Sequence, residues 1–177
     1  MPTMCPYVKC DFSTLDPGAY VTKGTGSQSA ALLESCGLSV IAMGADNEMR
    51  EVNVFDSSEM DVDDPDLGSP NEMCSPPGPG VGMGGEPTSY FSNCDPQGNL
   101  LIIQDPRVPD ETDPNDSGFG GCFKFEFVVE FSLINMGLLD VEEPTSITVS
   151  LLSPSLKEGN PVLQSCFLTQ SCALLSY

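Results

Sequence analysis

Glycine and proline are spread along the whole chain and constrain its fold more than any other feature of the sequence. The 177 residues include 17 glycines and 16 prolines. Proline removes a backbone donor and clashes inside a helix, and glycine weakens regular structure through its conformational entropy. The sequence therefore disfavours long helices and favours short strands joined by turns and loops. Its length fits one domain of ordinary size.

Several short segments have the periodicity of β-strands. In residues 123–131, apolar and charged side chains alternate, which predicts a strand with one buried face. Residues 100–103 are a continuous apolar run, which is typical of a central strand buried on both faces. Further strands are expected at residues 38–42, 51–55, 133–139 and 146–152.

Turn signals suggest how these segments are joined. A short helix is expected at residues 29–35, ended by Cys36 and Gly37. The polar turn at residues 44–47 is expected to join the strands at 38–42 and 51–55 as antiparallel neighbours. About six or seven strands separated by proline- and glycine-rich loops predict an all-β fold, an antiparallel β-sandwich with long acidic and Gly/Pro-rich loops.

Eight cysteines indicate a disulfide-bonded protein. They are widely spaced and include no CxxC motif: Cys5, Cys10, Cys36, Cys74, Cys94, Cys122, Cys166 and Cys172. Such a set favours disulfides formed in an oxidising compartment, with reduced buried thiols and structural zinc as the alternatives. The sequence leaves the pairing open. However, Cys74 and Cys94 bracket the glycine-rich part of a long loop, residues 57–98, and their pairing would close it.

The charge of the chain and its missing residue types exclude several functions. The chain carries 26 acidic and 6 basic side chains, a net charge of −20, so it cannot neutralise a nucleic-acid backbone. It has no histidine, which excludes a Ser-His-Asp triad and an HExxH zinc site. It has no tryptophan platform for a glycosidase cleft. No apolar run approaches the ~20 residues that span a bilayer. We therefore expect a non-enzymatic protein without a membrane span.

Acidic side chains follow three of the expected strands. Asp56 ends one strand, Asp105 another, and Asp140 with Glu142 a third. If these ends meet at one rim of the sandwich, their repulsion calls for a cation, and Ca²⁺ accepts oxygen ligands from irregular loops. The candidate ligands are Asp56, Asp64, Asp66, Asn71, Gln104, Asp105, Asp140 and Glu142. The alternative is that these side chains only solvate the loops.

Four segments, taken in order along the chain, form a pattern. They are FDS at residues 55–57, DPDLGSPN at 64–71, GNLLIIQD at 98–105 and GLLDVEE at 137–143. Over residues 11–152 the chain resembles a family of extracellular jelly-roll modules found in secreted and cell-surface proteins of bacteria and marine algae. The resemblance implies a calcium-stabilised jelly roll used in surface layers, adhesins or appendages, and no enzymatic activity. By position it implies Asp56, Asp66, Gln104 and Asp140 as the main ligands.

Both ends of the chain depart from this family pattern. We expect an N-terminal arm at residues 1–10, the jelly-roll β-sandwich at 11–152 and a C-terminal strand or tail at 153–177. Family members continue with two further strands where this chain has only the short segment 159–177. A missing strand would leave an open sheet edge, which invites strand addition from another copy. Residues 172–175 or residues 1–10 are the expected donors.

Two signals bear on the location of the protein. The residues after Met1 lack the basic stretch and the apolar segment that are typical of a signal peptide. We therefore expect that a leader has been removed or that the chain is part of a longer polypeptide. Asn115, Asp116 and Ser117 form a sequon, which makes Asn115 a candidate glycosylation site if a eukaryote secretes the chain.

These features together predict an extracellular, non-enzymatic structural or adhesion module at a cell surface. Its expected cofactor is Ca²⁺, and its expected role is that of a subunit in a surface assembly, fibre, filament or appendage. The expected partners are further copies of the chain, joined by strand exchange, or other surface proteins. The alternative is a carbohydrate-binding module that recognises glycans, since Tyr90, Phe91 and Phe119 lie in expected loops.

Overall fold

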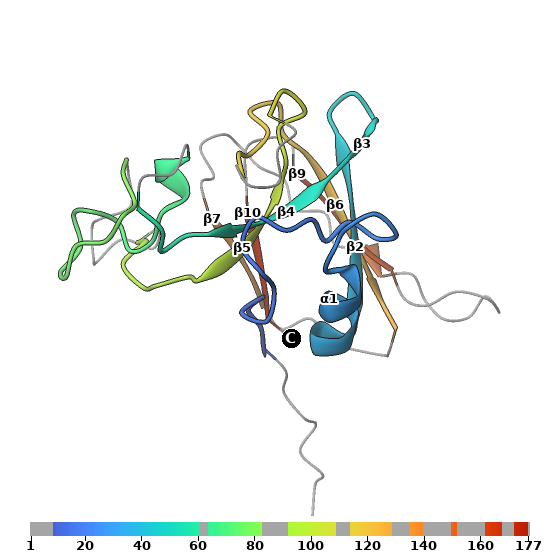
Figure 1. The fold of residues 1–177 in the computed structure, drawn as a ribbon, viewed down its shortest axis with the longest axis horizontal. Helices are drawn as coiled ribbons and strands as arrows, with labels where there is room; N and C mark the ends of the chain where they lie inside the picture. Colours follow the sequence, from blue (N-terminus) through green and yellow to red (C-terminus); the bar gives the residue numbers. More distant parts are fainter. Residues whose placement is uncertain are drawn as a thin grey trace, which may run out of the picture.

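The residues that the structure describes form a mostly β fold with two antiparallel sheets and one α-helix, α1 (Ser29–Cys36) (Figure 1). It is seen in a computed structural model that describes residues 9–60, 64–82, 92–108, 114–128, 135–139, 150–151, 162–167 and 172–176. The predicted β-rich, disulfide-bonded fold is confirmed, but the described strands do not by themselves close into a jelly roll. Within these ranges, no helix is both long and apolar enough to cross a membrane.

The first sheet, sheet A, joins strands from distant parts of the sequence. Its strands are β1 (Lys9–Cys10), β4 (Val52–Asp56), β5 (Asn99–Ile103), β7 (Asn135–Leu139) and β10 (Cys172–Ser176). Their order is β1-β10-β5-β4, and β7 also pairs with β10. Ala173 of β10 is opposite both Leu101 of β5 and Leu138 of β7, so β10 has a partner strand on each side. Sheet A is therefore built around β10.

The second sheet, sheet B, has the order β3-β2-β6-β9-β8. Its strands are β2 (Leu38–Gly44), β3 (Met49–Arg50), β6 (Gly121–Phe127), β8 (Ser150–Leu151) and β9 (Val162–Phe167). Buried and partly exposed residues alternate along β2 and β6, so each of these strands buries one face. For β6 this is the alternation that the sequence predicts at residues 123–131.

One hydrophobic cluster contains buried side chains from both sheets. Its members from the strands are Cys10, Val52, Val54, Leu101 and Ile103 of sheet A and Leu38, Val40, Ala42, Phe123, Phe125 and Phe127 of sheet B. A second cluster consists of Phe55, Leu100 and Ile102 together with Leu67, which comes from the short 3₁₀ helix η1 (Pro65–Leu67). Alternate residues of a strand face opposite sides, so β4 and β5 are covered on both faces.

Helix α1 ends where the sequence predicts. Gly37 has φ 65°, in the left-handed region that favours glycine, and its N–H donates to the carbonyl oxygen of Leu33 at 2.9 Å. A disulfide between Cys10 and Cys36 joins β1 to the last turn of the helix, with 5.5 Å between the Cα atoms. The helix is thereby fastened to sheet A while it packs beside β2.

The expected hairpin between residues 38–42 and 51–55 is wrong. The turn after β2 leads instead into the two-residue strand β3, and Ala42 is opposite Arg50. β4 belongs to the other sheet, where it pairs with β5. The physical reason is that residues 52–55 are all buried, so this segment needs apolar partners on both of its faces.

The expectation that the chain lacks its final strands is also wrong. β9 and β10 lie within the segment assigned to the C-terminal strand or tail, and each pairs with strands of its own chain. A strand needs only about five or six residues, so even a short segment supplies two of them. Self-association by strand exchange stays a prediction, but one of its two proposed donors, residues 172–175, already lies in sheet A.

Candidate functional site

The long connection between β4 and β5 folds into an ordered unit, called here the loop unit (residues 57–60, 64–82 and 92–98). Ser57 and Ser69, both fully buried, fasten its two ends together. The hydroxyl oxygen of Ser57 lies 2.6 Å from that of Ser69 and donates to the carbonyl oxygen of Gly98 at 2.8 Å. The Ser69 hydroxyl also accepts the N–H of Gln97 at 2.9 Å. These bonds satisfy the buried loop backbone from within the chain.

Glycines allow two backbone segments of the loop unit to touch. A Cβ atom on Gly80 would lie 2.1 Å from the carbonyl oxygen of Gly68. A Cβ atom on Gly78 would lie 2.2 Å from the carbonyl oxygen of Pro70. No side chain fits at either distance, so close backbone packing accounts for glycine at positions 78 and 80.

Asn71 is the buried side chain that organises the turn next to these glycines. Its Oδ1 accepts the N–H of Met73 at 3.0 Å. Its Nδ2 donates to the carbonyl oxygens of Val81 at 3.3 Å and Gly82 at 3.2 Å. Asn71 was predicted as a metal ligand, but in the structure both ends of its amide bind loop backbone.

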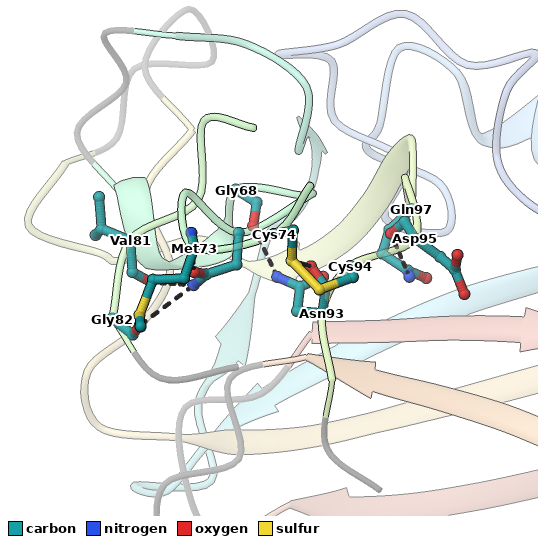
Figure 2. Close-up of a disulfide and its surroundings, with 10 residues drawn as sticks. Gly68, Met73, Cys74, Val81, Gly82, Asn93, Cys94, Asp95 and Gln97 are labelled. Atoms are coloured by element: carbon teal, nitrogen blue, oxygen red, sulfur yellow. Dashed lines mark hydrogen bonds between the residues drawn. A yellow bond between two sulfur atoms is a disulfide. The ribbon is translucent and has the colours of Figure 1, made fainter. Parts of the chain in front are cut away.

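A disulfide between Cys74 and Cys94 closes the loop unit across a sequence separation of 20 residues (Figure 2). The predicted closure of this loop is confirmed. Beside it, the Nδ2 of Asn93 donates to the carbonyl oxygen of Gly68 at 2.8 Å. The Oδ1 of Asn93 is the one buried side-chain oxygen or nitrogen in the described part of the chain that has no hydrogen-bond partner.

Three acidic ligand candidates lie at the end of β4 or in the loop that follows it, and their surroundings differ. The Oδ1 of Asp56 accepts both the backbone N–H of Ser58 at 2.9 Å and its hydroxyl at 2.6 Å. The Oδ2 of Asp64 accepts the backbone N–H of Asp116 at 2.6 Å. Asp66 is exposed on η1. Asp56 and Asp64 therefore hold turns and loops, as Asx residues commonly do.

Gln104 and Asp105 follow β5 and are buried. The Oε1 of Gln104 accepts the side-chain amide of Asn53 at 3.2 Å and the backbone N–H of Asn115 at 3.3 Å. The Asp105 carboxylate accepts the Nε–H of Arg107 on both oxygens, at 3.0 and 2.9 Å, and forms an ion pair with its guanidinium. These bonds to Arg107 lower the pKa of the Asp105 carboxyl below its ordinary value, so it stays ionised at neutral pH.

The structure separates the predicted calcium ligands into two groups. Asp56 is opposite Asn99, at the start of β5, whereas Gln104 and Asp105 follow its end. Five residues of extended strand put about 17 Å between Asn99 and Gln104, whereas Ca²⁺ ligands lie within about 2.6 Å of the ion. Asp64 lies with the second group, because Asp116, whose N–H it accepts, is bridged to Gln104.

The described ligand candidates therefore do not fit one calcium site. In the described ranges, no three acidic or cysteine side chains are grouped so that they could hold a metal ion. Asp140 and Glu142 lie outside the described residues. Calcium binding stays a prediction.

The ion pair of Asp105 and Arg107 predicts a pH dependence of stability. Because the folded-state pKa of Asp105 is lowered, its contribution is present above the unfolded pKa of ~3.9 and is lost as the pH falls through the folded pKa. Asp105→Asn is expected to lower the melting midpoint at pH 7, and the difference from wild type is expected to shrink below about pH 4. The exposed Asp66→Asn variant serves as the control. A difference that stays constant down to pH 2 would contradict this origin.

The remaining candidate residues are placed only in part. Tyr90 and Phe91 lie outside the described residues. Phe119 is exposed, and the guanidinium carbon of Arg107 lies 4.8 Å from the centre of its ring, so one face of this aromatic side chain is already covered. Asn115 is half-buried, and its carbonyl oxygen accepts the N–H of Asp105 at 2.9 Å. Glycosylation of Asn115 stays a prediction.

The predicted cysteines fall into three classes. Four of them form the disulfides Cys10–Cys36 and Cys74–Cys94. Cys122 is half-buried on β6, Cys166 is in β9 and Cys172 begins β10. Cys5 lies outside the described residues.

Sequence reasoning missed the buried polar side chains that hold the loops. Asn53 is fully buried inside β4, and the Thr22 hydroxyl accepts the N–H of Val52 at 2.6 Å. The available signal for such a buried, hydrogen-bonded side chain was an Asn in an otherwise apolar strand, because β-strands are depleted in Asn and a buried amide needs hydrogen-bond partners.

Comparison of the chain with protein-family models, with curated protein sequences and with solved structures finds no match.

Proposed function

We propose that the chain is a non-enzymatic structural module of an extracellular assembly, and that the complete chain forms a jelly roll. The observation that carries the proposal is the use of buried polar groups in the loop unit. Ser57, Ser69 and Asn71 direct their hydrogen bonds to loop backbone or to each other. A region built in this way holds its shape and does not present convergent polar groups to a substrate.

Four of the described carboxyls are held as anions by their hydrogen bonds, which fits a structural role for these four groups. A general acid or base works best with a pKa near the working pH, which for a carboxyl requires a raised pKa. Where a shift is resolved among the described carboxyls, the pKa is lowered: Asp11, Asp46, Asp105 and Glu126. Hydrogen bonds from serine, backbone N–H, arginine or lysine are the main cause in each case. These groups stabilise local structure as anions.

The disulfides support an extracellular location. Cys10–Cys36 and Cys74–Cys94 are consistent with an oxidising environment, because disulfides rarely persist where glutathione keeps thiols reduced. A cell-surface or secreted location is part of the proposal.

The net charge of −20 predicts how an assembly of this chain would respond to salt. Copies repel one another at low ionic strength, and the screening length falls from about 30 Å at 0.01 M salt to about 8 Å at 0.15 M. We expect the oxidised protein to be monomeric in 0.01 M salt and to associate reversibly as salt and protein concentration rise. Sedimentation velocity over a concentration series, with electron microscopy of the associated samples, measures this.

Two results would count against the structural role. One is a strict monomer at high protein concentration and physiological salt. The other is saturable binding to a glycan array, which would favour the carbohydrate-binding alternative. The reduced protein serves as the control, because association that depends on the folded module should be lost when its disulfides are reduced.

Removal of divalent cations tests the calcium prediction separately. If calcium stabilises the module as the sequence predicts, chelation is expected to lower the melting midpoint, and an unchanged midpoint would contradict a structural calcium ion. Melting curves with excess chelator and with added calcium measure this. A midpoint that rises with calcium would support binding, and if Asp140 and Glu142 are among the ligands, the D140N/E142Q double variant is expected to abolish the rise.

A further inference from the structure

Cys122 and Cys166 are directly opposite each other in sheet B. β6 and β9 run antiparallel, and their register pairs Gly121 with Phe167, Cys122 with Cys166 and Phe123 with Ser165. Directly opposed residues lie on the same face of a sheet, and their Cβ atoms are about 4.5–5.5 Å apart. The pairing follows from strand register, and it is not evident in the sequence, where the two cysteines are separated by 44 residues.

The hydrogen bonds between β6 and its other neighbour, β2, show whether Cys122 and Cys166 are a hydrogen-bonded or a non-hydrogen-bonded pair. The N–H of Val128 donates to the carbonyl oxygen of Gly37 at 3.0 Å, continuing the ladder between β6 and β2. Along a strand, the backbone groups of alternate residues point to opposite neighbours. Val128 points to β2, so Cys122, six positions earlier, also points its N–H and C=O to β2 and away from β9.

A second hydrogen bond, near the other end of the ladder between β2 and β6, also shows that Cys122 directs its backbone groups to β2. The N–H of Gly44 donates to the carbonyl oxygen of Glu48 at 2.8 Å, on the β3 side of β2. Gly44 and its partner Gly121 are therefore a pair without hydrogen bonds between them, and the adjacent pair, Met43 and Cys122, is hydrogen-bonded. Cys122 and Cys166 are consequently a non-hydrogen-bonded pair of the β6–β9 ladder.

This geometry suits a disulfide. In a non-hydrogen-bonded antiparallel pair the Cα atoms are about 4.5 Å apart, within the range of about 4.4–6.8 Å found for disulfides. The face of β6 that carries Cys122 is also accessible. Cys122 alternates with the buried Phe123 and is half-buried on the same face as Lys124 and Glu126. An oxidant can therefore reach this face without unfolding the core.

We propose that Cys122 and Cys166 form a third disulfide, which fastens β9 to β6. The oxidant is a disulfide from outside this chain, either glutathione disulfide or the disulfide of an exchange enzyme. The thiolate of one cysteine attacks it and releases one thiol, and the thiolate of the other cysteine then attacks the mixed disulfide and releases a second. Two electrons pass to the oxidant, whose two sulfurs leave as thiols with the two protons of the cysteines. The proposal does not depend on the structural role argued above.

Other cysteines compete poorly for Cys122. Cys10, Cys36, Cys74 and Cys94 are paired with each other. Cys172 is in sheet A, where it is opposite Leu139. Cys5 lies outside the described residues, so its pairing with Cys122 is one of the results that the test must distinguish.

Peptide mapping tests the proposal. Protein refolded with glutathione disulfide is alkylated in acid-quenched denaturant and digested without reduction. Trypsin cuts after Arg107, Lys124 and Lys157, and so separates Cys122 from the C-terminal cysteines. Chymotrypsin cuts after Phe167, and so separates Cys166 from Cys172. We expect a Cys122–Cys166 peptide pair that disappears on reduction. Cys122 linked to Cys5 or Cys172, or alkylated while the other two disulfides have formed, would overturn the proposal.

Thiol counts in denaturant give a second readout that does not depend on digestion. If the bond forms, Cys122→Ser frees the Cys166 thiol and raises the count by one relative to wild type. The double variant Cys122→Ser/Cys166→Ser then returns the count to the wild-type value. A count that falls by one in the single variant would refute the bond, as would a count in the double variant that differs from wild type.

Discussion

Phe125→Ala is expected to lower the free energy of unfolding by about 3–5 kcal/mol, the usual cost of removing a buried phenylalanine ring. Phe125 is fully buried in β6, in the cluster that both sheets share. Its ring is stacked with that of Phe123, with 5.8 Å between the ring centres. Truncation leaves a cavity between two sheets whose strands are fixed by their pairing, so the site can collapse only in part. Urea unfolding followed by circular dichroism measures the loss.

Lys124→Ala is the matched control for this prediction. Lys124 precedes Phe125 but faces outward, where its Nζ lies 2.9 Å from the Oε1 of Glu126. Such partly exposed ion pairs contribute little, so the control is expected to change the free energy of unfolding by less than about 1 kcal/mol. Equal losses in the two variants would show that β6 does not bury the face that carries the phenylalanines.

Removing the Cys74–Cys94 disulfide is expected to cost about 3 kcal/mol, as the chain-entropy model gives for a loop of this length. The double variant Cys74→Ser/Cys94→Ser leaves the loop unit with its serine and asparagine hydrogen bonds but without its covalent closure. Because Leu67 of η1 covers Phe55, Leu100 and Ile102, loosening of the loop unit uncovers the outer face of β4 and β5. Amide hydrogen exchange should therefore rise in β5 and in the loop unit.

Sheet B supplies the internal control for the disulfide variant. β2 and β6 make no pairing with the loop unit, so their exchange rates relative to global unfolding should stay close to those of the wild type. Uniformly faster exchange in both sheets would mean that the loop unit and sheet B unfold as one cooperative unit. Unchanged exchange throughout would contradict the assigned role of the disulfide.

Local sequence patterns predicted the individual elements well. α1, β5 and β6 were all predictable, because a helix cap, a continuous apolar run and a strict alternation are each written in a few adjacent residues. Strand partners were less predictable. β4 was assigned to the neighbour nearest in sequence, but its true partner β5 follows only after the loop unit. Pairing depends on which apolar faces are left uncovered, and a single segment does not show this.

The same reasoning explains why the predicted metal site did not assemble from the described residues. Residues that follow successive strands were expected to meet at one rim. In an antiparallel pair, however, the end of one strand lies beside the start of the next, so Asp56 and Asp105 come to opposite ends of β4 and β5. The partners of the buried amides were equally hidden, because Asn53 and Gln104 meet only when these two strands are paired.

The place of β10 inside sheet A has a consequence for how the protein is made. β10 pairs with β1, so that Lys9 is opposite Ser176, and it also separates β7 from β5. A ribosome releases β1, β4, β5 and β7 well before it releases β10, and until then these segments have no central strand to join them. Sheet A therefore completes only after translation has passed residue 176, and until then its earlier strands leave apolar surface uncovered.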